Sequence, residues 1–336
     1  MSRAREWGRA IPPRRVDLSV RIGSLELRNP VLTASGTFGY GDEYAHVVDL
    51  RRLGGIVTKT VTVRPRPGNA PTRIAETAGG MLNSIGLENV GLARFRSEKL
   101  PRLAELKATV IASVGGETED ELAELLEALG AEPGVAAFEI NFSCPNVAAG
   151  GARYWASPSR LEATMRRLRP LSPRPLIAKL SPDVTDIRDT ARACEAGGAD
   201  ALTAVNTFVG MSIDLDRMRS RLGRATGGLS GPAIKPLALA RCHEAAHAVG
   251  IPVIGSGGVA GGRDALEFIA AGAAAVQIGT ATFVEPGVAA RVVDEMREWL
   301  ASHGIARVAD FRGTFAAPAA QGCAPADARE LAEDRP

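Results

Sequence analysis

The chain has 336 residues, of which 45 % are hydrophobic and 4 % aromatic, and its 40 basic and 38 acidic residues leave a net charge of +2. This size suits one large globular domain or two small ones, and the near balance of charge with few aromatic side chains argues against a protein that binds nucleic acid. Every apolar run is far shorter than the roughly 20 residues of a membrane-spanning helix, so we expect no membrane partner.

The N-terminal stretch MSRAREWGRAIPPRR is basic and lacks the apolar core of a secretory signal. We therefore expect residues 1–16 to form a disordered basic extension and the protein to be cytoplasmic. The four cysteines lie far apart and form no C-x-x-C pair, so neither a metal site nor an iron–sulfur cluster is expected within this chain. They are Cys144, Cys194, Cys242 and Cys323.

A short hairpin is predicted in LSVRIGSLELRNP (18–30), and eight strand-like segments follow it. Each of these is rich in Val, Ile, Leu and Ala at its start and becomes polar or glycine-rich at its end. Continuous apolar runs of this kind are typical of parallel strands that are covered on both faces. The eight segments are 31–35, 54–61, 109–116, 136–144, 175–182, 201–207, 251–258 and 275–281.

Helix signals fall between these strands. The segment ETEDELAELLEALG (117–130) has acidic residues in its first turn, a leucine stripe and a terminal glycine. Eight strand–helix units predict an α/β fold, a (β/α)₈ TIM barrel over residues 17–308, with the hairpin closing its bottom. Residues 309–336 are expected to be a partly mobile tail. A doubly wound sheet is the alternative, but it needs a G-x-G-x-x-G turn where the chain reads GTFGYGDEY.

Reactive groups in such a barrel lie at the C-terminal ends of the strands. Two lysines and two asparagines lie just inside otherwise apolar strands here: Lys59, Lys179, Asn141 and Asn206. A buried lysine needs an anionic partner, whereas asparagine offers the donors and acceptors that suit a planar heterocycle with imide edges. Glu139 shares the parity of Asn141, so we expect it one layer deeper in the barrel, paired with Lys179.

Glycines end the seventh and eighth strands, in GSGGV and IGTA. Such barrels often bind phosphate at these two strand ends, through exposed backbone N–H groups. A phosphate at one side of the barrel mouth, with lysines and amides at its centre, suggests flavin mononucleotide (FMN). Apart from lysine, the only residue at a strand end with suitable proton-transfer chemistry is Cys144, in the segment EINFSCPNVAAGG.

Nine motifs, in order along the chain, resemble those of class 1 dihydroorotate dehydrogenases over residues 18–290. They are ASGTFGYGDEY, TKTVT, NSIGLEN, EINFSCPNV, AKLSP, VNT, GGLSGPAIKP, IGSGGV and IGTATF. The segments SCPNV and ASGTFGYG look most like the NAD-linked subclass, 1B. Membrane-bound class 2 relatives place serine at the position of Cys144 and add a membrane-binding segment, which sets this chain apart from them.

This resemblance implies oxidation of dihydroorotate to orotate in pyrimidine biosynthesis, with Cys144 as the base. The residues that would hold FMN are Ser35, Lys59, Thr60, Ser113, Asn141, Lys179, Val205, Gly231, Gly257, Gly258, Gly279 and Thr280. The residues that would hold the substrate are Lys59, Asn83, Ser84, Ile85, Gly86, Leu87, Asn141, Asn206 and Thr207. Ser113 departs from the family pattern, which often has asparagine there. The resemblance also implies a homodimer that joins a separate FAD and iron–sulfur subunit in a heterotetramer and passes electrons to NAD.

Three alternatives remain at this stage. A fumarate-linked enzyme of subclass 1A would share the site but not the partner, and a dihydropyrimidine dehydrogenase-like enzyme would act on a ring without the carboxylate. A phosphate-binding isomerase or lyase barrel would hold no flavin.

Overall fold

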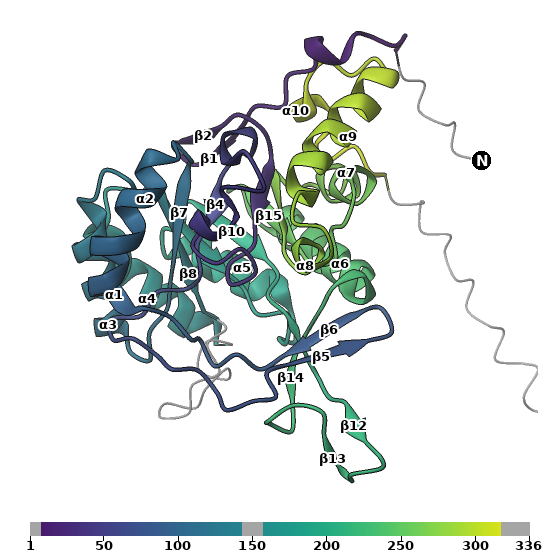
Figure 1. Cartoon of the computed structure of the whole chain (residues 1–336). Helices are drawn as coiled ribbons and strands as arrows, with labels where there is room; N and C mark the ends of the chain where they lie inside the picture. The colour runs from purple at the N-terminus through teal and green to yellow at the C-terminus, as the bar shows by residue number, and fades with distance from the viewer. Residues whose placement is uncertain (1–7, 143–156, 317–336) are drawn as a thin grey trace, which may run out of the picture.

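Eight parallel strands form one closed barrel in the computed structural model, which describes residues 8–142 and 157–316 (Figure 1). Their order around the barrel is β3, β16, β15, β10, β9, β8, β7, β4. A parallel bridge between Leu32 and Gly55 joins the last strand to the first. The strands are β3 (Val31–Thr33), β4 (Ile56–Val57), β7 (Val110–Val114), β8 (Ala137–Asn141), β9 (Leu176–Lys179), β10 (Ala201–Ala204), β15 (Val253–Ser256) and β16 (Ala275–Ile278). The predicted TIM barrel and its eight strands are confirmed.

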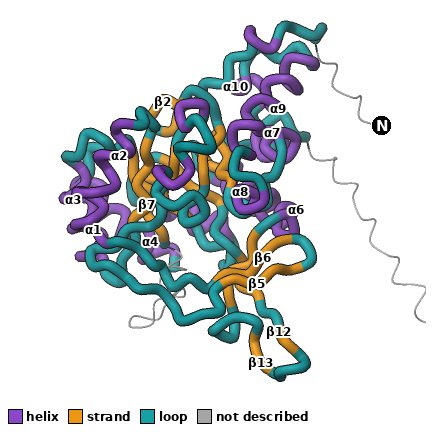
Figure 2. The backbone as a smooth tube through the Cα atoms, in the orientation of Figure 1, coloured by secondary structure: helices purple, strands orange, loops and turns teal. Residues whose placement is uncertain are grey.

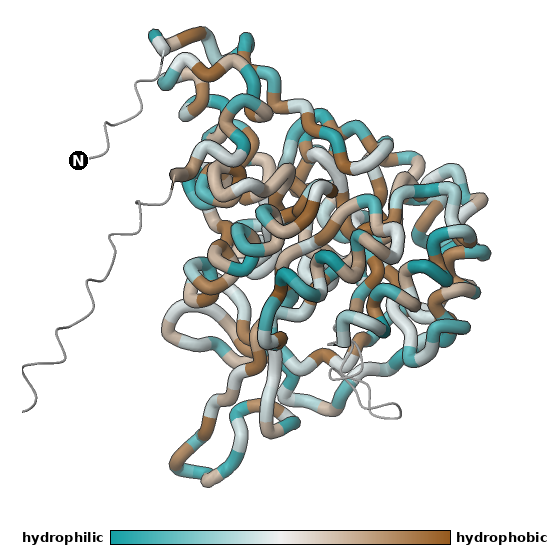
Figure 3. Tube along the Cα trace, turned by 180° about the vertical axis from the view of Figure 1, so that it is seen from behind, coloured by the Kyte–Doolittle hydropathy of each residue, from teal (hydrophilic) through white to brown (hydrophobic). Residues whose placement is uncertain are grey.

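Helices cover the outside of the barrel because the strands are apolar on both faces. In α3 (Glu119–Gly130), the Thr118 hydroxyl accepts a hydrogen bond from the Glu121 N–H at 3.2 Å, and the leucine stripe is buried. Figure 3 shows the resulting alternation of hydrophilic and hydrophobic residues along the outer helices. The other helices include α4 (Pro158–Leu168), α5 (Ile187–Ala196), α6 (Lys235–Ala248), α7 (Gly262–Ala270), α8 (Ala281–Val284) and α9 (Val288–Ser302). A continuous helical segment, α1 (Gly91–Arg94), a π-helical turn (Phe95–Lys99) and α2 (Leu100–Glu105), precedes β7. No helix in the described ranges is long and apolar enough to cross a membrane.

The hairpin of β1 (Val20–Ile22) and β2 (Leu25–Leu27) closes the bottom of the barrel, as predicted. Ile22 and Leu27 are buried against one apolar residue from each of the eight barrel strands. These partners are Leu32, Val57, Ile111, Ala137, Ile177, Ala201, Ile254 and Ala275. The opposite, C-terminal end is therefore the end available for a site.

A second sheet, which the sequence analysis did not predict, lies at that C-terminal end (Figure 2). It is antiparallel and has the order β11 (Phe208–Gly210), β14 (Gly227–Ser230), β6 (Gly80–Asn83), β5 (Ile74–Thr77). A small hairpin, β12 (Ile213–Asp214) with β13 (Arg219–Ser220), projects beyond it. The sheet brings two long loops, after β4 and after β10, together over one side of the barrel mouth.

Both terminal segments differ in part from expectation. Residues 11–16 are held in place, since the Ile11 N–H donates to Ala301 O at 2.9 Å, a 3₁₀ helix spans Pro13–Arg15, and Val16 is buried. The expected disorder of residues 1–16 is thus wrong for this part. At the other end, α10 (Val308–Phe311) continues into a stretch where Phe315 N–H donates to Ala270 O at 3.0 Å. The packed chain therefore runs past the predicted boundary at 309.

Candidate functional site

A buried polar network lies at the centre of the barrel, below its mouth. Lys179 Nζ is 3.3 Å from a carboxylate oxygen of Glu139, 3.1 Å from Gln277 Oε1 and 3.3 Å from Ser35 Oγ. The other Glu139 oxygen accepts from Thr203 Oγ1 at 2.9 Å and from the Gln277 amide. The expected Glu139–Lys179 pair is confirmed. Because the Glu139 carboxylate compensates its charge, the Lys179 ammonium is stable in this buried position directly beneath the mouth.

Amide and hydroxyl groups form the next layer towards the mouth. Asn206 Nδ2 donates to Asn141 Oδ1 at 3.3 Å, and Asn206 Oδ1 accepts from the Thr207 N–H at 2.8 Å. On the neighbouring side, the hydroxyls of Thr60 and Ser113 are 2.9 Å apart. These contacts fix the orientation of both asparagine amides, so their polar edges are positioned before any ligand arrives.

Lys59 lies two residues after the end of β4 and is half-buried. Its backbone N–H donates to Gly39 O at 2.7 Å, which ties it to the first loop. Its ammonium makes no hydrogen bond or salt bridge within the described ranges. Burial lowers the pKa of Lys59 below its ordinary value, and the nearby Glu88 carboxylate offsets part of this shift. A half-buried lysine of this kind is suited to binding an anionic group.

The predicted substrate segment, Asn83–Leu87, begins at the end of β6. Asn83 Nδ2 donates to Gly228 O at 3.1 Å, in the neighbouring strand β14. Gly228 in turn lies against Thr207, so closely that a β-carbon on Gly228 would overlap the Thr207 hydroxyl. The substrate segment is therefore connected through β14 to Thr207 and the Asn206–Asn141 pair. Gly86 and Leu87 have positive φ angles, of 74° and 55°, which turn the segment back on itself.

The glycine-rich ends of β15 and β16 lie together on the other side of the mouth, because these two strands are neighbours. The backbone N–H groups of Gly257, Gly258, Gly279 and Thr280 donate to no acceptor among the residues that the structure describes. Thr280 Oγ1 donates to Ser230 Oγ at 2.8 Å, which links this corner to β14 beside Gly231. Gly231 and Gly258 have φ angles of 98° and 75°, which only glycine adopts without strain. Val205 is buried, and its N–H donates to Ser256 O at 3.0 Å.

Cys144, the predicted base, lies outside the described residues. The cysteines that are described, Cys194 and Cys242, are fully buried, and burial raises the pKa of each thiol to about 12. Neither is therefore suited to act as a base near neutral pH. Within residues 8–142 and 157–316, no three metal-ligating side chains come together.

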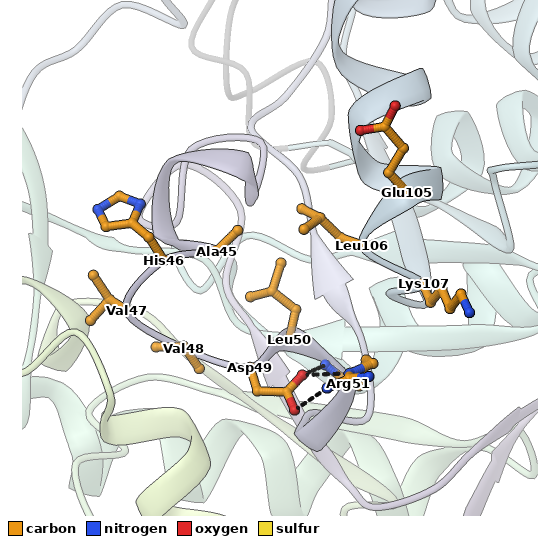
Figure 4. Close-up of a pocket in the computed structure, with 10 residues that line it drawn as sticks. All are labelled: Ala45, His46, Val47, Val48, Asp49, Leu50, Arg51, Glu105, Leu106 and Lys107. Atoms are coloured by element: carbon orange, nitrogen blue, oxygen red, sulfur yellow. Dashed lines mark hydrogen bonds and ion pairs between the residues drawn. The ribbon is translucent and has the colours of Figure 1, made fainter.

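One surface pocket, with a volume of about 440 Å³, lies away from the mouth (Figure 4). Residues 45–51 and 105–107 line it, and these stretches lead into the N-terminal ends of β4 and β7. Asp49 pairs with Arg51 within it, at 2.9 Å. The pocket therefore lies near the N-terminal ends of these strands, whereas the polar groups described above lie at the C-terminal end of the barrel.

Comparison with known proteins agrees with this arrangement. A family model described as dihydroorotate dehydrogenase matches residues 17–300. The chain belongs to the dihydroorotate dehydrogenase family. It is therefore an oxidoreductase, as the motifs predicted. The matched range contains all eight strands of the barrel.

The chain is similar to curated members of the family named dihydroorotate dehydrogenase B (NAD(+)), catalytic subunit. It is 52 % identical to the one from Trichlorobacter lovleyi over 298 residues, which cover 89 % of this chain and 98 % of that protein. It is 51 % identical to the one from Geobacter sulfurreducens, with the same coverage. A solved structure of DHODH from Eimeria tenella, in complex with ferulenol, has a TM-score of 0.75, 26 % identity, and coverage of 89 % of this chain and 88 % of that one.

The central network contains two residues that were not predicted from the sequence, Gln277 and Thr203. Both are polar residues inside apolar strands, and both are fully buried. The same signal singled out Lys179 and Glu139, so it was available for these two residues as well. The described candidate residues all lie towards the C-terminal end of the barrel, some in the central network below the mouth and the others on either side of the mouth.

Proposed function

We propose that this protein oxidises dihydroorotate to orotate in the biosynthesis of pyrimidines (UMP), with FMN as its bound cofactor. The observation that carries the proposal is the meeting of Lys59, Asn83, Asn141, Asn206 and Thr207 at the same end of the barrel as the backbone N–H groups after β15 and β16. The names of the curated relatives support the same reaction.

The residues at the mouth of the barrel fit FMN in two respects. The N–H groups of Gly257, Gly258, Gly279 and Thr280 suit a phosphate, because they have no acceptor of their own among the described residues. The Lys179 ammonium is fixed by Glu139 and Gln277, so it presents a stable positive charge to a flavin ring. We propose that these residues hold FMN together with Ser35, Lys59, Thr60, Ser113, Asn141, Val205 and Gly231. When bound, FMN would supply the acceptor for the hydride that leaves C6 of the substrate.

The substrate has a carboxylate and an imide-like ring edge, and the chain offers a partner for each. The Lys59 ammonium suits the carboxylate, since burial strengthens its attraction to an anion. The amides of Asn83, Asn141 and Asn206, with the Thr207 hydroxyl, offer donors and acceptors to the ring edge. The carboxylate side of the substrate would also contact the backbone of the segment that contains Ser84, Ile85, Gly86 and Leu87.

Cys144 would remove the proton from C5. It follows β8 by three residues, and Asn141 ends that strand inside the site. A free thiol with a pKa of about 8.5 is mostly protonated at neutral pH, so proton removal should become faster as the pH rises. The Lys59 ammonium and the asparagine amides would stabilise the charge that develops on the ring carbonyl as the proton leaves.

The curated relatives are named catalytic subunits of an NAD(+)-linked enzyme. We therefore propose that this chain forms a homodimer and assembles with a separate subunit that carries FAD and an iron–sulfur cluster, through which electrons reach NAD. The heterotetramer is the expected assembly, and the cytoplasm its expected location.

The proposal is tested on the full chain, purified alone and together with the candidate partner subunit. Mass spectrometry of the released chromophore should identify FMN, and dihydroorotate should yield orotate. NAD should be reduced only when the partner is present. Turnover with fumarate by the chain alone, without NAD reduction in the complex, would indicate the fumarate-linked subclass. Turnover of dihydrouracil but not dihydroorotate would contradict the proposed substrate.

A further inference from the structure

Two asparagines, Asn69 and Asn89, form hydrogen bonds with the substrate segment, residues 83–87. We propose that Asn89, assisted by Asn69, is a positioning residue that preorganises this segment for the substrate, without touching the substrate itself. This inference rests on the proposed function, because it assumes that the segment binds dihydroorotate.

Asn89 uses every polar group of its side chain inside the protein. Its Nδ2 donates to Leu87 O at 2.8 Å and to Thr62 Oγ1 at 2.9 Å. Its Oδ1 accepts from the Gly91 N–H at 2.9 Å and from the Thr62 N–H at 3.2 Å. The side chain is buried, so these bonds have little competition from water. No donor or acceptor of this amide is left for a ligand.

The backbone of Asn89 is fixed as well. Its N–H donates to Arg66 O at 3.1 Å, and its carbonyl accepts from the Arg66 N–H at 3.0 Å. Asn89 therefore joins the segment to the stretch after β4 through both its backbone and its side chain. The bond to Leu87 O acts at the residue whose φ is +55°, an uncommon conformation for leucine that needs support from its surroundings.

Asn69 holds the other end of the same segment. Its Nδ2 donates to Ser84 O at 3.1 Å and to Ser84 Oγ at 3.0 Å, and its N–H donates to Ile85 O at 2.9 Å. Gly86 lies against it, such that a β-carbon on Gly86 would come within 2.6 Å of the Asn69 side chain. The two asparagines thus support residues 84–87 from both ends.

Rigid segments bind more tightly because less conformational freedom is lost on binding. Removal of the Asn89 amide leaves two buried N–H groups and the Leu87 carbonyl without their partner, which favours other conformations of the segment. The expected effect is weaker binding of substrate and product. The chromophore should be retained, since the glycines proposed to hold its phosphate, in residues 257–258 and 279–280, lie across the mouth.

Asn29 provides a matched control at the closed end of the barrel. It is also buried, its Nδ2 donates to Arg52 O at 2.8 Å, and its Oδ1 accepts from the Val31 N–H at 3.1 Å. Asn29→Ala should destabilise the barrel by a comparable mechanism, but it is remote from the substrate segment.

The experiment measures the Kd of orotate by the change in the flavin spectrum, and the amide hydrogen exchange of residues 84–87 without orotate. Asn89→Ala should raise the Kd by about 10-fold or more and speed up exchange, with the chromophore retained. Asn69→Ala, at a half-buried position that is better tolerated, should act in the same direction. Asn29→Ala should change neither quantity.

An unchanged Kd in both Asn69→Ala and Asn89→Ala, or an equal rise in Asn29→Ala, would overturn the inference. If the protein does not act on dihydroorotate, the result differs: orotate leaves the flavin spectrum of the wild type unchanged. That result would contradict the proposed function and the inference together. The amide hydrogen exchange of residues 84–87, measured without orotate, tests the role of the two asparagines independently of the substrate. If exchange stays at the wild-type rate in Asn89→Ala, the positioning role is wrong even though dihydroorotate is the substrate.

Discussion

Lys179 Nζ lies 3.3 Å from the Glu139 carboxylate inside the barrel, where both side chains are almost completely buried. Removal of one member of such a pair leaves a buried charge without compensation, which typically costs about 3–5 kcal/mol. Glu139→Gln should therefore lower the free energy of unfolding by about 3 kcal/mol or more, measured by chemical denaturation.

The double variant Glu139→Gln/Lys179→Met is the control for this prediction. Because it removes both charges, its loss of stability should be clearly smaller than the sum of the losses in the two single variants. Simple additivity would mean that the two groups do not stabilise each other, and would contradict the role of the pair.

Ile22 tests the closure of the barrel bottom. It is fully buried among the first residues of the strands, so Ile22→Ala should lower the free energy of unfolding by about 3 kcal/mol. Glu26→Ala, on the exposed side of the same hairpin, should have little effect. The cofactor should remain bound in both variants. Equal stability of Ile22→Ala and Glu26→Ala would show that the hairpin does not contribute to the core.

Lys59 gives a prediction for the pH dependence of ligand binding. Burial lowers the pKa of its ammonium, and an anionic ligand favours the protonated form. The affinity for orotate should thus be highest below this lowered pKa and should fall as the pH rises through it. Titration of orotate between pH 7 and 10, followed by the flavin spectrum, measures the slope.

Lys59→Arg is the control, because a guanidinium stays charged across this range of pH. Any titration of the ligand or of other residues is common to both proteins, so only the difference between them reports on Lys59. Identical slopes in the wild type and in Lys59→Arg would exclude Lys59 as the group that binds the carboxylate.

Cys144 is tested by the rate of flavin reduction in stopped flow. Cys144→Ser should retain the chromophore and reduce it about 10²–10⁴-fold more slowly, since a positioned base contributes about this factor. Cys194→Ala is the matched control, because that thiol is buried in α5 and its pKa is raised to about 12. An unchanged rate in Cys144→Ser would remove the proposed base.

The barrel strands were predictable because each is buried on both faces and therefore reads as an apolar run. The antiparallel sheet was not, because most of its residues are half-buried or exposed and three of its four strands contain glycine. Gly80 and Gly228 are needed where the backbone of Ser230 and the side chain of Thr207 approach closely, and glycine normally signals a turn. Their role follows from contacts between segments about 150 residues apart, which no local pattern contains.

The candidate site was predicted from a second signal, a polar residue within an apolar strand. This signal identified Lys179 and Glu139, and the motif NSIGLEN identified Asn83. It did not reveal Asn89 as a support for the segment, because that role depends on hydrogen bonds to Thr62 and Leu87. The basic charge of residues 11–16 suggested disorder, whereas their backbone contacts with α9 decide their structure.

Whether this protein is a flavin enzyme that oxidises dihydroorotate is tested by the absorbance spectrum of the purified full chain before and after addition of dihydroorotate, without oxygen. We expect a flavin spectrum that is bleached by dihydroorotate, together with the formation of one orotate per flavin. A colourless protein, or a flavin spectrum that dihydroorotate leaves unchanged, would contradict it.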